Sequence, residues 1–544
     1  MNSNVYTGNI VDLYAKRIFY GSIFVISGSI ATIQETGPEK KNFPYILPGF
    51  IDAHVHIESS MLVPTEFARL ATTHGTVATI SDPHEIANVC GMDGVRFMIN
   101  NAKNTPLHIF FGASPCVPAT SFETAGATLK PADIEELFVK EGLLYLSEMM
   151  NYPGVLNKNP DVIEKIRIAQ KYGRPIDGHA PGLFGEDAKE YASAGITTDH
   201  ECFTLEEALG KIQCGMKILI REGSAAKNYE ALHTLIKTHP QSVMFCSDDK
   251  HPDNLIEGHI NDIVRRSIAK GYNIFDVLKC ACINPVEHYK LPLGTLREKD
   301  PADFIIVSDL KDFRVTQTYI KGEKVAENGT SLLKYQQPEC INNFNIHPIT
   351  DGELQLQLSS NSVKVIEAKD GELVTSEIHE RAKVESGNLV SDVEKDLLKI
   401  AVVNRYTKAK PAIALVKNFG LKYGAIASSV AHDSHNIIAV GVDDKSMCEA
   451  INAIISCKGG ISAFEGSNGE VLSLPVAGIM SDREGSAVAR QYSRLDQRAK
   501  SMGSNLTSPF MTLSFMALLV IPSLKLSDCG LFDGETFDFT SLEI

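Results

Sequence analysis

Pro48-Gly49-Phe50-Ile51-Asp52-Ala53-His54-Val55-His56 is an apolar segment that ends in two histidines, two positions apart. Successive side chains of a β-strand point to opposite faces, so His54 and His56 project to the same side and can bind one ion together. A His-x-His pair alone is weak evidence, because most histidine pairs in a long chain are exposed or hydrogen-bonded. The rest of the chain has to supply further ligands before a metal site is predicted.

Strand-like and helix-like segments alternate from this point to about residue 282. After the first strand we expect strands at 76–81, 107–112, 143–149, 174–179, 196–200, 216–221 and 242–248, separated by segments with helical periodicity. These make eight strands over about 230 residues. Eight strands alternating with helices are typical of a (β/α)8 TIM-like barrel, whose active site lies at the C-terminal ends of the strands. The predicted fold class is therefore α/β.

Polar side chains gather at those predicted strand ends. They are His54 and His56 (first strand), Asp82 and His84 (second), Glu148 (fourth), His179 (fifth), His200 (sixth), and Asp248 and Asp249 (eighth). Strand ends converge in a barrel, so these side chains are expected to meet. Imidazole and carboxylate ligands together suit Zn²⁺, Fe²⁺ or Mn²⁺. The sequence therefore predicts a metal site.

Several of these segments resemble the amidohydrolase superfamily. They are residues 48–56, Gly178-His179-Ala180-Pro181, Thr198-Asp199-His200-Glu201 and Cys246-Ser247-Asp248-Asp249. Within that superfamily the chain is most similar to the adenine deaminase family, through His56-Ile57-Glu58-Ser59-Ser60-Met61, Ser81-Asp82-Pro83-His84-Glu85-Ile86-Ala87-Asn88, Ser147-Glu148-Met149-Met150-Asn151-Tyr152-Pro153-Gly154 and Val430-Ala431-His432-Asp433-Ser434-His435-Asn436. The resemblance extends over essentially the whole chain.

The resemblance implies a centre of two divalent transition-metal ions. His54, His56 and Asp248 would bind one ion, and His179 and His200 the other. Many members of the superfamily bridge the ions with a carboxylated lysine, but this chain has Glu148 at the end of the fourth strand. Glu148 is expected to take the bridging role. The resemblance favours Mn²⁺ or Fe²⁺, and Zn²⁺ suits the same ligands.

The resemblance also implies hydrolytic deamination of adenine to hypoxanthine and ammonia, a reaction of purine salvage and adenine catabolism. A hydroxide held by the ions, formed because the metal lowers the pKa of bound water toward ~7, would attack C6. Asp248 would accept its proton and pass it to the departing amino group, so Asp248 and Glu148 are the expected catalytic residues. Spacing alone does not rank Asp248 above Asp249 as the ligand. Asp248 is preferred because it comes first after the strand.

Two other functions remain open at this point. The nearer is another deaminase or a cyclic amidohydrolase that keeps the same metal centre and differs in the pocket loops. The farther is a non-catalytic barrel scaffold, against which the complete set of ligand residues argues. Release of ammonia from adenine would distinguish adenine deamination from both of these alternatives.

Five further residues are candidates for binding the substrate: Glu58, Ser59, His84, Glu201 and Asp249. Each has a plainer interpretation. Ser59 and the following serine could cap a helix that begins near residue 64. His84, together with the glutamate after it, could serve a loop that follows the second strand. Glu201 would point away from the site if its strand continued. Asp52 is predicted to hydrogen-bond a liganding histidine.

The segments outside the barrel predict two more domains. Short strands at 10–13, 17–20, 21–27 and 29–34, broken at Gly21 and Gly28, are expected to form a small flanking β-sandwich of residues 1–47 and 296–333 beside a barrel of residues 48–295. A polar linker at 334–345 then leads to an additional C-terminal α+β domain, residues 346–544. For His432, Asp433 and His435 in that domain, a structural or pocket-closing role is favoured over a second metal site.

Composition limits the partners. The 544 residues carry a formal net charge of −15, with no sustained basic run, so nucleic acid and anionic membranes are disfavoured. The expected partners are adenine and further copies of the chain, a dimer being one possibility. The eleven cysteines have no framework-like spacing and the first residues lack a signal peptide pattern, which favours a cytoplasmic protein. The apolar run at 510–524 contains a proline and is expected to be a buried strand or helix.

Overall fold

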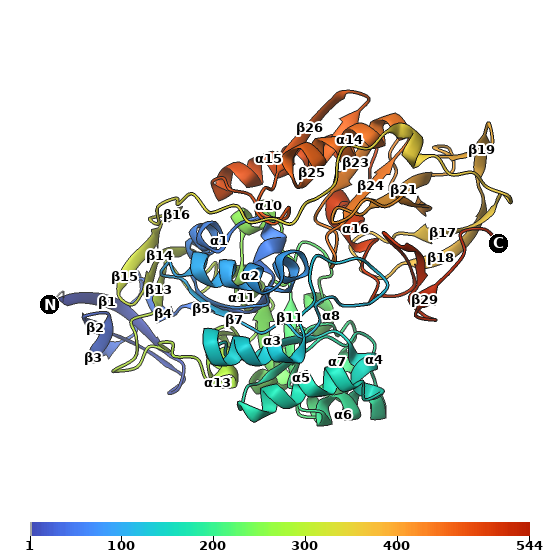
Figure 1. Ribbon diagram of the computed structural model, residues 1–544. Helices are drawn as coiled ribbons and strands as arrows, with labels where there is room; N and C mark the ends of the chain where they lie inside the picture. Colours follow the sequence, from blue (N-terminus) through green and yellow to red (C-terminus); the bar gives the residue numbers. More distant parts are fainter. Residues whose placement is uncertain (1–2) are drawn as a thin grey trace.

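The computed structural model describes residues 3–544 (Figure 1). A sheet lies at one side of the molecule, and its strands come from the segments before and after the predicted barrel. Its eight strands run in the order β16-β15-β14-β13-β4-β1-β2-β3. At the centre, β4 (Tyr45–Pro48) pairs in parallel with β1 (Ser3–Asp12) and antiparallel with β13 (Phe304–Val307). The remaining strands are β2 (Arg17–Ile26), β3 (Ser29–Pro38), β14 (Val315–Ile320), β15 (Glu323–Glu327) and β16 (Thr330–Ser331). The segments before and after the barrel thus share one sheet.

One predicted break in this sheet is wrong. β2 continues through Gly21, where the pairing with β3 shifts register. A Cβ at Gly21 would lie 2.5 Å from the carbonyl oxygen of Gln34, so the glycine permits a close approach of two backbones inside the strand. The break predicted at Gly28 is present, because that residue has φ of +84° in the turn between β2 and β3.

Eight parallel strands form the middle of the molecule. They are β5 (Phe50–Val55), β6 (Thr76–Ser81), β7 (His108–Phe111), β8 (Leu146–Met149), β9 (Ile176–Gly178), β10 (Thr198–Asp199), β11 (Lys217–Arg221) and β12 (Val243–Cys246). Ladders join β5-β6-β7, β8-β9 and β10-β11-β12. Single parallel bridges, Ala113 with Leu146, Ile176 with Ile196 and Val55 with Asp248, connect these groups and return the pairing to β5. This is the arrangement of a TIM-barrel-type domain.

Helices separate the strands along the chain. They are α1 (Pro64–Ala71), α2 (His84–Ala102), α3 (Pro131–Glu136), α4 (Tyr152–Leu156), α5 (Pro160–Lys171), α6 (Gly185–Ser193), α7 (Leu205–Gln213), α8 (Tyr229–Leu232), α9 (Leu235–Thr238), α10 (Pro252–Glu257), α11 (Ile260–Ala269), α12 (Ile274–Leu278) and α13 (Asn284–Tyr289). The ends of these helices use local sequence signals. Asn159 and Thr204 accept hydrogen bonds from backbone N–H groups in the first turns of α5 and α7.

The start of α2 differs from the expected loop. The helix begins at His84, directly after β6, and Gly91 interrupts it with a non-helical backbone (φ 59°, ψ −141°). The kink interrupts the helical periodicity of the apolar residues. The sequence pattern therefore indicates only the part of the helix that follows Gly91. His84 and Glu85 are therefore held on the first turn of a helix.

The C-terminal part is organised around a second eight-stranded sheet. Its order is β18-β17-β22-β21-β24-β23-β25-β26, from β17 (Ser362–Glu367), β18 (Ser376–Arg381), β21 (Leu397–Val403), β22 (Ala412–Lys417), β23 (Ala425–Ser428), β24 (Ile437–Gly441), β25 (Gly460–Glu465) and β26 (Asn468–Ser473). On β24, Ile437 and Ala439 pack in the core that includes α14 (Asp444–Cys457), whereas Ile438 and Val440 pack in the core that includes α16 (Pro509–Phe515). The alternation separates two cores across the sheet.

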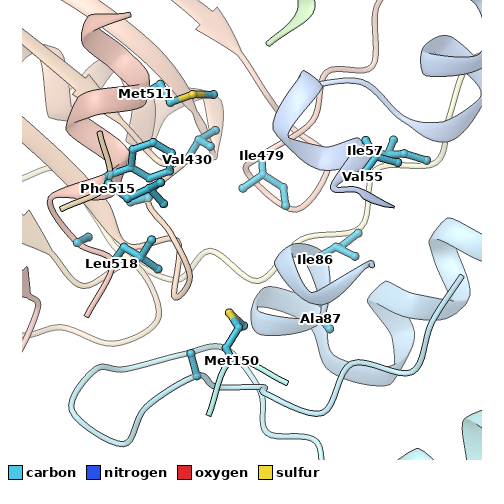
Figure 2. Packing of buried hydrophobic residues seen from close by; sticks show 14 of the residues in the cluster. Val55, Ile57, Ile86, Ala87, Met150, Val430, Ile479, Met511, Phe515 and Leu518 are labelled. Atoms are coloured by element: carbon cyan, nitrogen blue, oxygen red, sulfur yellow. The ribbon is translucent and has the colours of Figure 1, made fainter. Parts of the chain in front are cut away.

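The second of these cores is shared with the barrel. Val55 and Ile86 of the barrel belong to the same buried cluster as Phe515 and Leu518 of the C-terminal part. Figure 2 shows Met150 and Ile86 on one side of this cluster, with Phe515 and Leu518 on the other. The apolar run predicted to be buried is α16 and its continuation. Among residues 3–544, no helix is long and apolar enough to cross a membrane.

Candidate metal centre and its pocket

Two histidines at the end of β5 meet Asp248, the second residue after β12. His54 Nε2 and His56 Nε2 lie 3.1 Å apart. Asp248 Oδ1 lies 3.4 Å from the first and 3.1 Å from the second. The bridge of Val55 with Asp248 brings these strand ends together. Of the two adjacent aspartates, Asp248 is the one that contacts both imidazoles.

A second pair of histidines comes from β9 and β10. His179 Nδ1 and His200 Nε2 lie 3.3 Å apart. Glu148 Oε2, at the end of β8, lies 2.8 Å from His179 and 3.2 Å from His200. The other oxygen, Glu148 Oε1, lies 3.1 Å from His56 Nε2 and 4.0 Å from His54 Nε2. One carboxylate therefore faces both histidine pairs, one oxygen to each.

The donor set fits divalent cations better than it fits hydrogen bonding alone. His54 Nε2 and His56 Nε2 face each other and can share only one proton between them. Burial would raise the pKa of Glu148, but His179, His200 and His56 beside it hold that pKa well below its usual range. An ionised carboxylate among converging imidazole nitrogens is a typical environment for a first-row metal ion.

Arg221, at the end of β11, is a site residue that the sequence analysis did not identify. Its Nη1 donates to Asp248 Oδ2 at 2.7 Å and also to Glu201 Oε1. The guanidinium is fully buried. Burial would raise the pKa of Asp248, yet Arg221, followed by His54 and His56, holds it well below its usual range. The only available signal was its position at a strand end, where arginine does not resemble a metal ligand.

Glu201 lies inside the site, although a continuing strand would have turned it away. β10 ends at Asp199, so the alternation stops before this residue. Glu201 Oε1 lies 3.4 Å from His200 Nε2 and 3.6 Å from His179 Nδ1. Asp199, meanwhile, accepts from the backbone N–H of Glu201 at 2.7 Å and from buried Lys211 at 3.1 Å. These bonds hold the His200–Glu201 turn in place.

His84 lies beside His56 and Glu148. Its ring centroid is 4.5 Å from that of His56, and its Nδ1 lies 3.1 Å from Asp82 Oδ2 and 3.4 Å from Glu148 Oε1. Burial would lower the pKa of His84, but Asp82 and Glu85 raise it well above its usual range. The ring is therefore positioned to donate a hydrogen bond into the pocket from Nε2.

Asp52 supports the site through the backbone. Its Oδ1 accepts from the N–H of Ser247 at 2.9 Å, and its Oδ2 lies 2.8 Å from His259 Nε2. Its contact with His54 is to the backbone N–H at 3.4 Å, so the imidazole bond predicted for it is absent from the described contacts. Asp52 thus ties β5 to the residue before Asp248.

The remaining substrate candidates divide into two groups. Asp249 lines the same cavity as Glu148 and Asp248 and accepts from Ser59 Oγ at 2.5 Å. Glu58 points elsewhere, with Oε1 accepting from the N–H of Ile86 at 3.3 Å, and burial raises its pKa to about 7. Neither Glu58 nor Ser59 is among the described residues that line the cavity. Ser59 does not cap α1, whose N-cap is Val63.

The C-terminal part closes the cavity. Leu373, Phe515 and Leu518 form its apolar wall, and His432 and Asp433 reach it from the turn between β23 and β24. Glu85, in the first turn of α2, contacts both histidines of this turn. Its Oε1 lies 2.5 Å from His432 Nδ1, and its Oε2 contacts His435 Nε2. The cavity has a volume of about 20 Å³.

Comparisons with known proteins cover both large parts of the chain. Residues 45–325 match the amidohydrolase family, and residues 372–538 match the adenine deaminase C-terminal domain. A protein of Sulfurovum sp. (strain NBC37-1) named adenine deaminase is 55% identical over 532 residues, 98% of each chain. Proteins of the same name from Salinibacter ruber and Methanosarcina acetivorans are each 52% identical, and these matches cover 98% and 99% of this chain and 97% and 99% of theirs.

Proposed function

Because the chain belongs to the adenine deaminases of the amidohydrolase family, we propose that the cluster around Glu148 performs the hydrolysis of adenine. Adenine and water give hypoxanthine and ammonia, so the enzyme is a hydrolase acting on the exocyclic C–N bond at C6. The observation that carries the assignment to this cluster is the convergence of two histidine pairs on the two oxygens of Glu148. The reaction belongs to purine salvage and adenine catabolism.

The family implies divalent metal ions, and the residues present suit two of them. One ion would be bound by His54, His56 and Asp248, and the other by His179 and His200. Glu148, which faces both histidine pairs, would be a ligand shared by the two ions. Manganese(II) or iron(II) is the proposed metal, with zinc(II) as the alternative that the same ligands accept. When bound, the ions supply a Lewis acid and a water of lowered pKa.

The protein residues then position the base and move the proton. Asp248 Oδ1 faces the histidines, while its Oδ2 is held by Arg221. Oδ1 is therefore the oxygen on the side of the histidines, where it can accept the proton of the attacking water and deliver it to the departing amino nitrogen. His84, oriented by Asp82, donates from Nε2 to a ring nitrogen of adenine. Asp249 and Glu201 complete the polar wall of the pocket.

The proposal extends to the organisation of the chain. A small flanking β-sandwich of residues 1–47 and 296–333 would accompany a (β/α)8 barrel of residues 48–295, with residues 346–544 as a C-terminal α+β domain. The eleven cysteines are free thiols, which supports a reducing, cytoplasmic location. A homodimer is the proposed assembly.

An assay of released ammonia tests the function directly. The purified full chain, prepared metal-free and reconstituted separately with Mn²⁺, Fe²⁺ or Zn²⁺, is given adenine, adenosine and cytosine. We expect ammonia from adenine, little from adenosine, and full activity at two metal equivalents per chain. A metal-replete protein that releases no ammonia from adenine would overturn the proposal.

A further inference from the structure

We propose that Asp433 of the C-terminal part accepts a hydrogen bond from the N9–H group of adenine and thereby selects the free base against purines substituted at N9. The inference rests on the proposed function, because it names the residue that recognises the far end of the same substrate. It is carried by the burial, the contacts and the position of Asp433.

The first observation is an unsatisfied carboxylate oxygen. Asp433 is only 3% exposed, and its Oδ2 is buried without a hydrogen-bond partner among the described residues. A buried polar atom without a partner costs free energy, so such an atom beside a cavity indicates a donor on the ligand. Asp433 lines the same cavity as Glu148 and Asp248.

The other carboxylates around the cavity have their partners. Glu85 contacts His432 and His435, and Glu201 accepts from Arg221. Glu148 and Asp248 face the imidazoles, and Asp249 accepts from Ser59. Within residues 3–544, Asp433 is the lining carboxylate that has an oxygen both buried and unpartnered. It is therefore the acceptor that remains for the substrate.

The second observation is the distance between Asp433 and the metal-facing residues. The His84 ring lies between them, with Nδ1 3.4 Å from Glu148 Oε1 and Nε2 3.7 Å from Asp433 Oδ1. One imidazole ring and two contacts thus separate the two carboxylates. A purine whose C6 faces Glu148 places its five-membered ring toward Asp433 across a comparable span.

The third observation is that hydrogen bonds hold the turn that contains Asp433 in place. Its neighbour His432 is bound to Glu85, and the carbonyl of Ser434 accepts from Tyr406 at 2.5 Å. Asn436 donates to the carbonyl of Thr124 at 2.9 Å. The turn is therefore fixed from both parts of the molecule, and a fixed acceptor discriminates between ligands better than a mobile one.

The chemistry of the substrate matches this acceptor. Free adenine has an N–H group at N9, whereas a nucleoside has a ribose there and no hydrogen to donate. A site built to hydrogen-bond one group strongly rejects an analogue that lacks it, because the buried acceptor is then left unpaired. Leu373, Phe515 and Leu518 add an apolar wall that suits the faces of the base but not a ribose.

The test compares adenine with 9-methyladenine, which differs only by the blocked N9. In Asp433→Ala, we expect kcat/KM for adenine to fall about 10- to 100-fold, as for the loss of a hydrogen bond to a charged acceptor. The ratio of kcat/KM for adenine to that for 9-methyladenine should fall at least about tenfold, because 9-methyladenine loses nothing. Asp433→Asn, which keeps a carbonyl acceptor of similar size, should restore part of the ratio.

The controls separate this inference from the proposed function. Glu372→Gln removes an exposed carboxylate beside Leu373 and should leave both substrates unaffected. Metal content is measured for each variant. An unchanged substrate ratio in Asp433→Ala, or a loss of metal from that variant, would overturn the role of Asp433. A wild-type enzyme inactive on adenine would instead overturn the proposed function.

Discussion

Asp248 has a backbone conformation that few residues adopt. Its φ is +52°, in the left-handed region, and its N–H donates to the carbonyl of His54 at 2.9 Å. Such a conformation costs free energy and persists where the surrounding contacts over-determine it. Here it turns the carboxylate toward His54 and His56 directly after the strand. The position of the proposed proton carrier is therefore determined by backbone and side chain together.

Replacing Asp248 with asparagine tests its proposed role. Asparagine tolerates the left-handed region and keeps the size of the side chain, so Asp248→Asn should fold. It cannot carry the proton, and we expect kcat for adenine to fall about 10²- to 10⁴-fold. Circular dichroism and metal analysis provide the control. Near-normal turnover in a metal-replete variant would assign proton transfer to another residue.

At the residue scale, the sequence predicts groups whose chemistry is recognisable on its own. Histidines and carboxylates at successive strand ends indicate a metal site, and the structure brings His54, His56, Glu148, His179, His200 and Asp248 together. Arg221 also ends a strand, but a lone arginine has many ordinary uses. Its role depends on which two carboxylates it contacts, Glu201 and Asp248, and that is a property of the folded chain.

Among the elements, β27 (Leu524–Ser527) holds the wall of the cavity. Lys525 on this strand donates from Nζ to the carbonyls of Leu373 and Phe515, at 2.6 Å and 3.0 Å. Both acceptors belong to residues that line the cavity. Lys525 is fully buried, and this burial lowers its pKa to about 7. The wall is thus attached through an amine that titrates near neutral pH.

This attachment predicts a pH-dependent stability. Between pH ~7 and the unfolded value of ~10.4, the unfolded chain carries a proton on Lys525 that the folded chain has released. The unfolded state binds more protons in this window, so the free energy of unfolding gains a contribution that rises with pH. Relative to Lys525→Met, the wild type should gain up to about 1.4 kcal/mol per pH unit.

Urea unfolding at pH 6.5, 8 and 9.5 measures that difference. Lys140→Met removes an exposed lysine and should follow the wild type at every pH. Identical pH dependence in the wild type and Lys525→Met would show that the buried amine keeps its proton.

Element boundaries were predicted less well than element types. Most strands of the barrel are recognisable because they are short apolar runs with polar residues at their ends. The first turns of α2 were not, because Gly91 interrupts the period on which recognition depends. At Gly21 the sequence predicts a break that is absent from the structure. A glycine that permits a close approach to Gln34 cannot be distinguished in the sequence from a glycine in a turn.

For the whole molecule, the proposed metal ligands come from separate strand ends and exist as a set only in the folded chain. Metal should therefore bind the folded state and not the unfolded one, raising the free energy of unfolding by about 2.7 kcal/mol when free metal is 100 times Kd. We expect chelation to remove activity and lower Tm, and Mn²⁺ to restore both. Glu148→Gln, which weakens both groups of ligands, should show a smaller metal-dependent change in Tm. An equal response in that variant would place the stabilising metal elsewhere.

The sequence could not predict how the C-terminal part completes the pocket. Asp433, Phe515 and Leu518 reach the cavity from positions far along the chain from His54, and no local pattern relates them to it. Their apolar or charged character alone is consistent with many surroundings. Only the packing of the shared core, together with the contacts of Glu85 with His432 and His435, brings them to the site.

The pairing of β4 with β13 has a consequence for biosynthesis. Pro48 pairs with Phe304, so the first sheet is completed only after more than half of the chain has left the ribosome. The pocket is completed later still, when Leu518 has emerged. Contacts this distant in sequence slow folding and expose unpaired strand edges meanwhile. A nascent chain halted before β13 has emerged would present an open edge on β4, which gives chaperones a strand edge to protect during this interval.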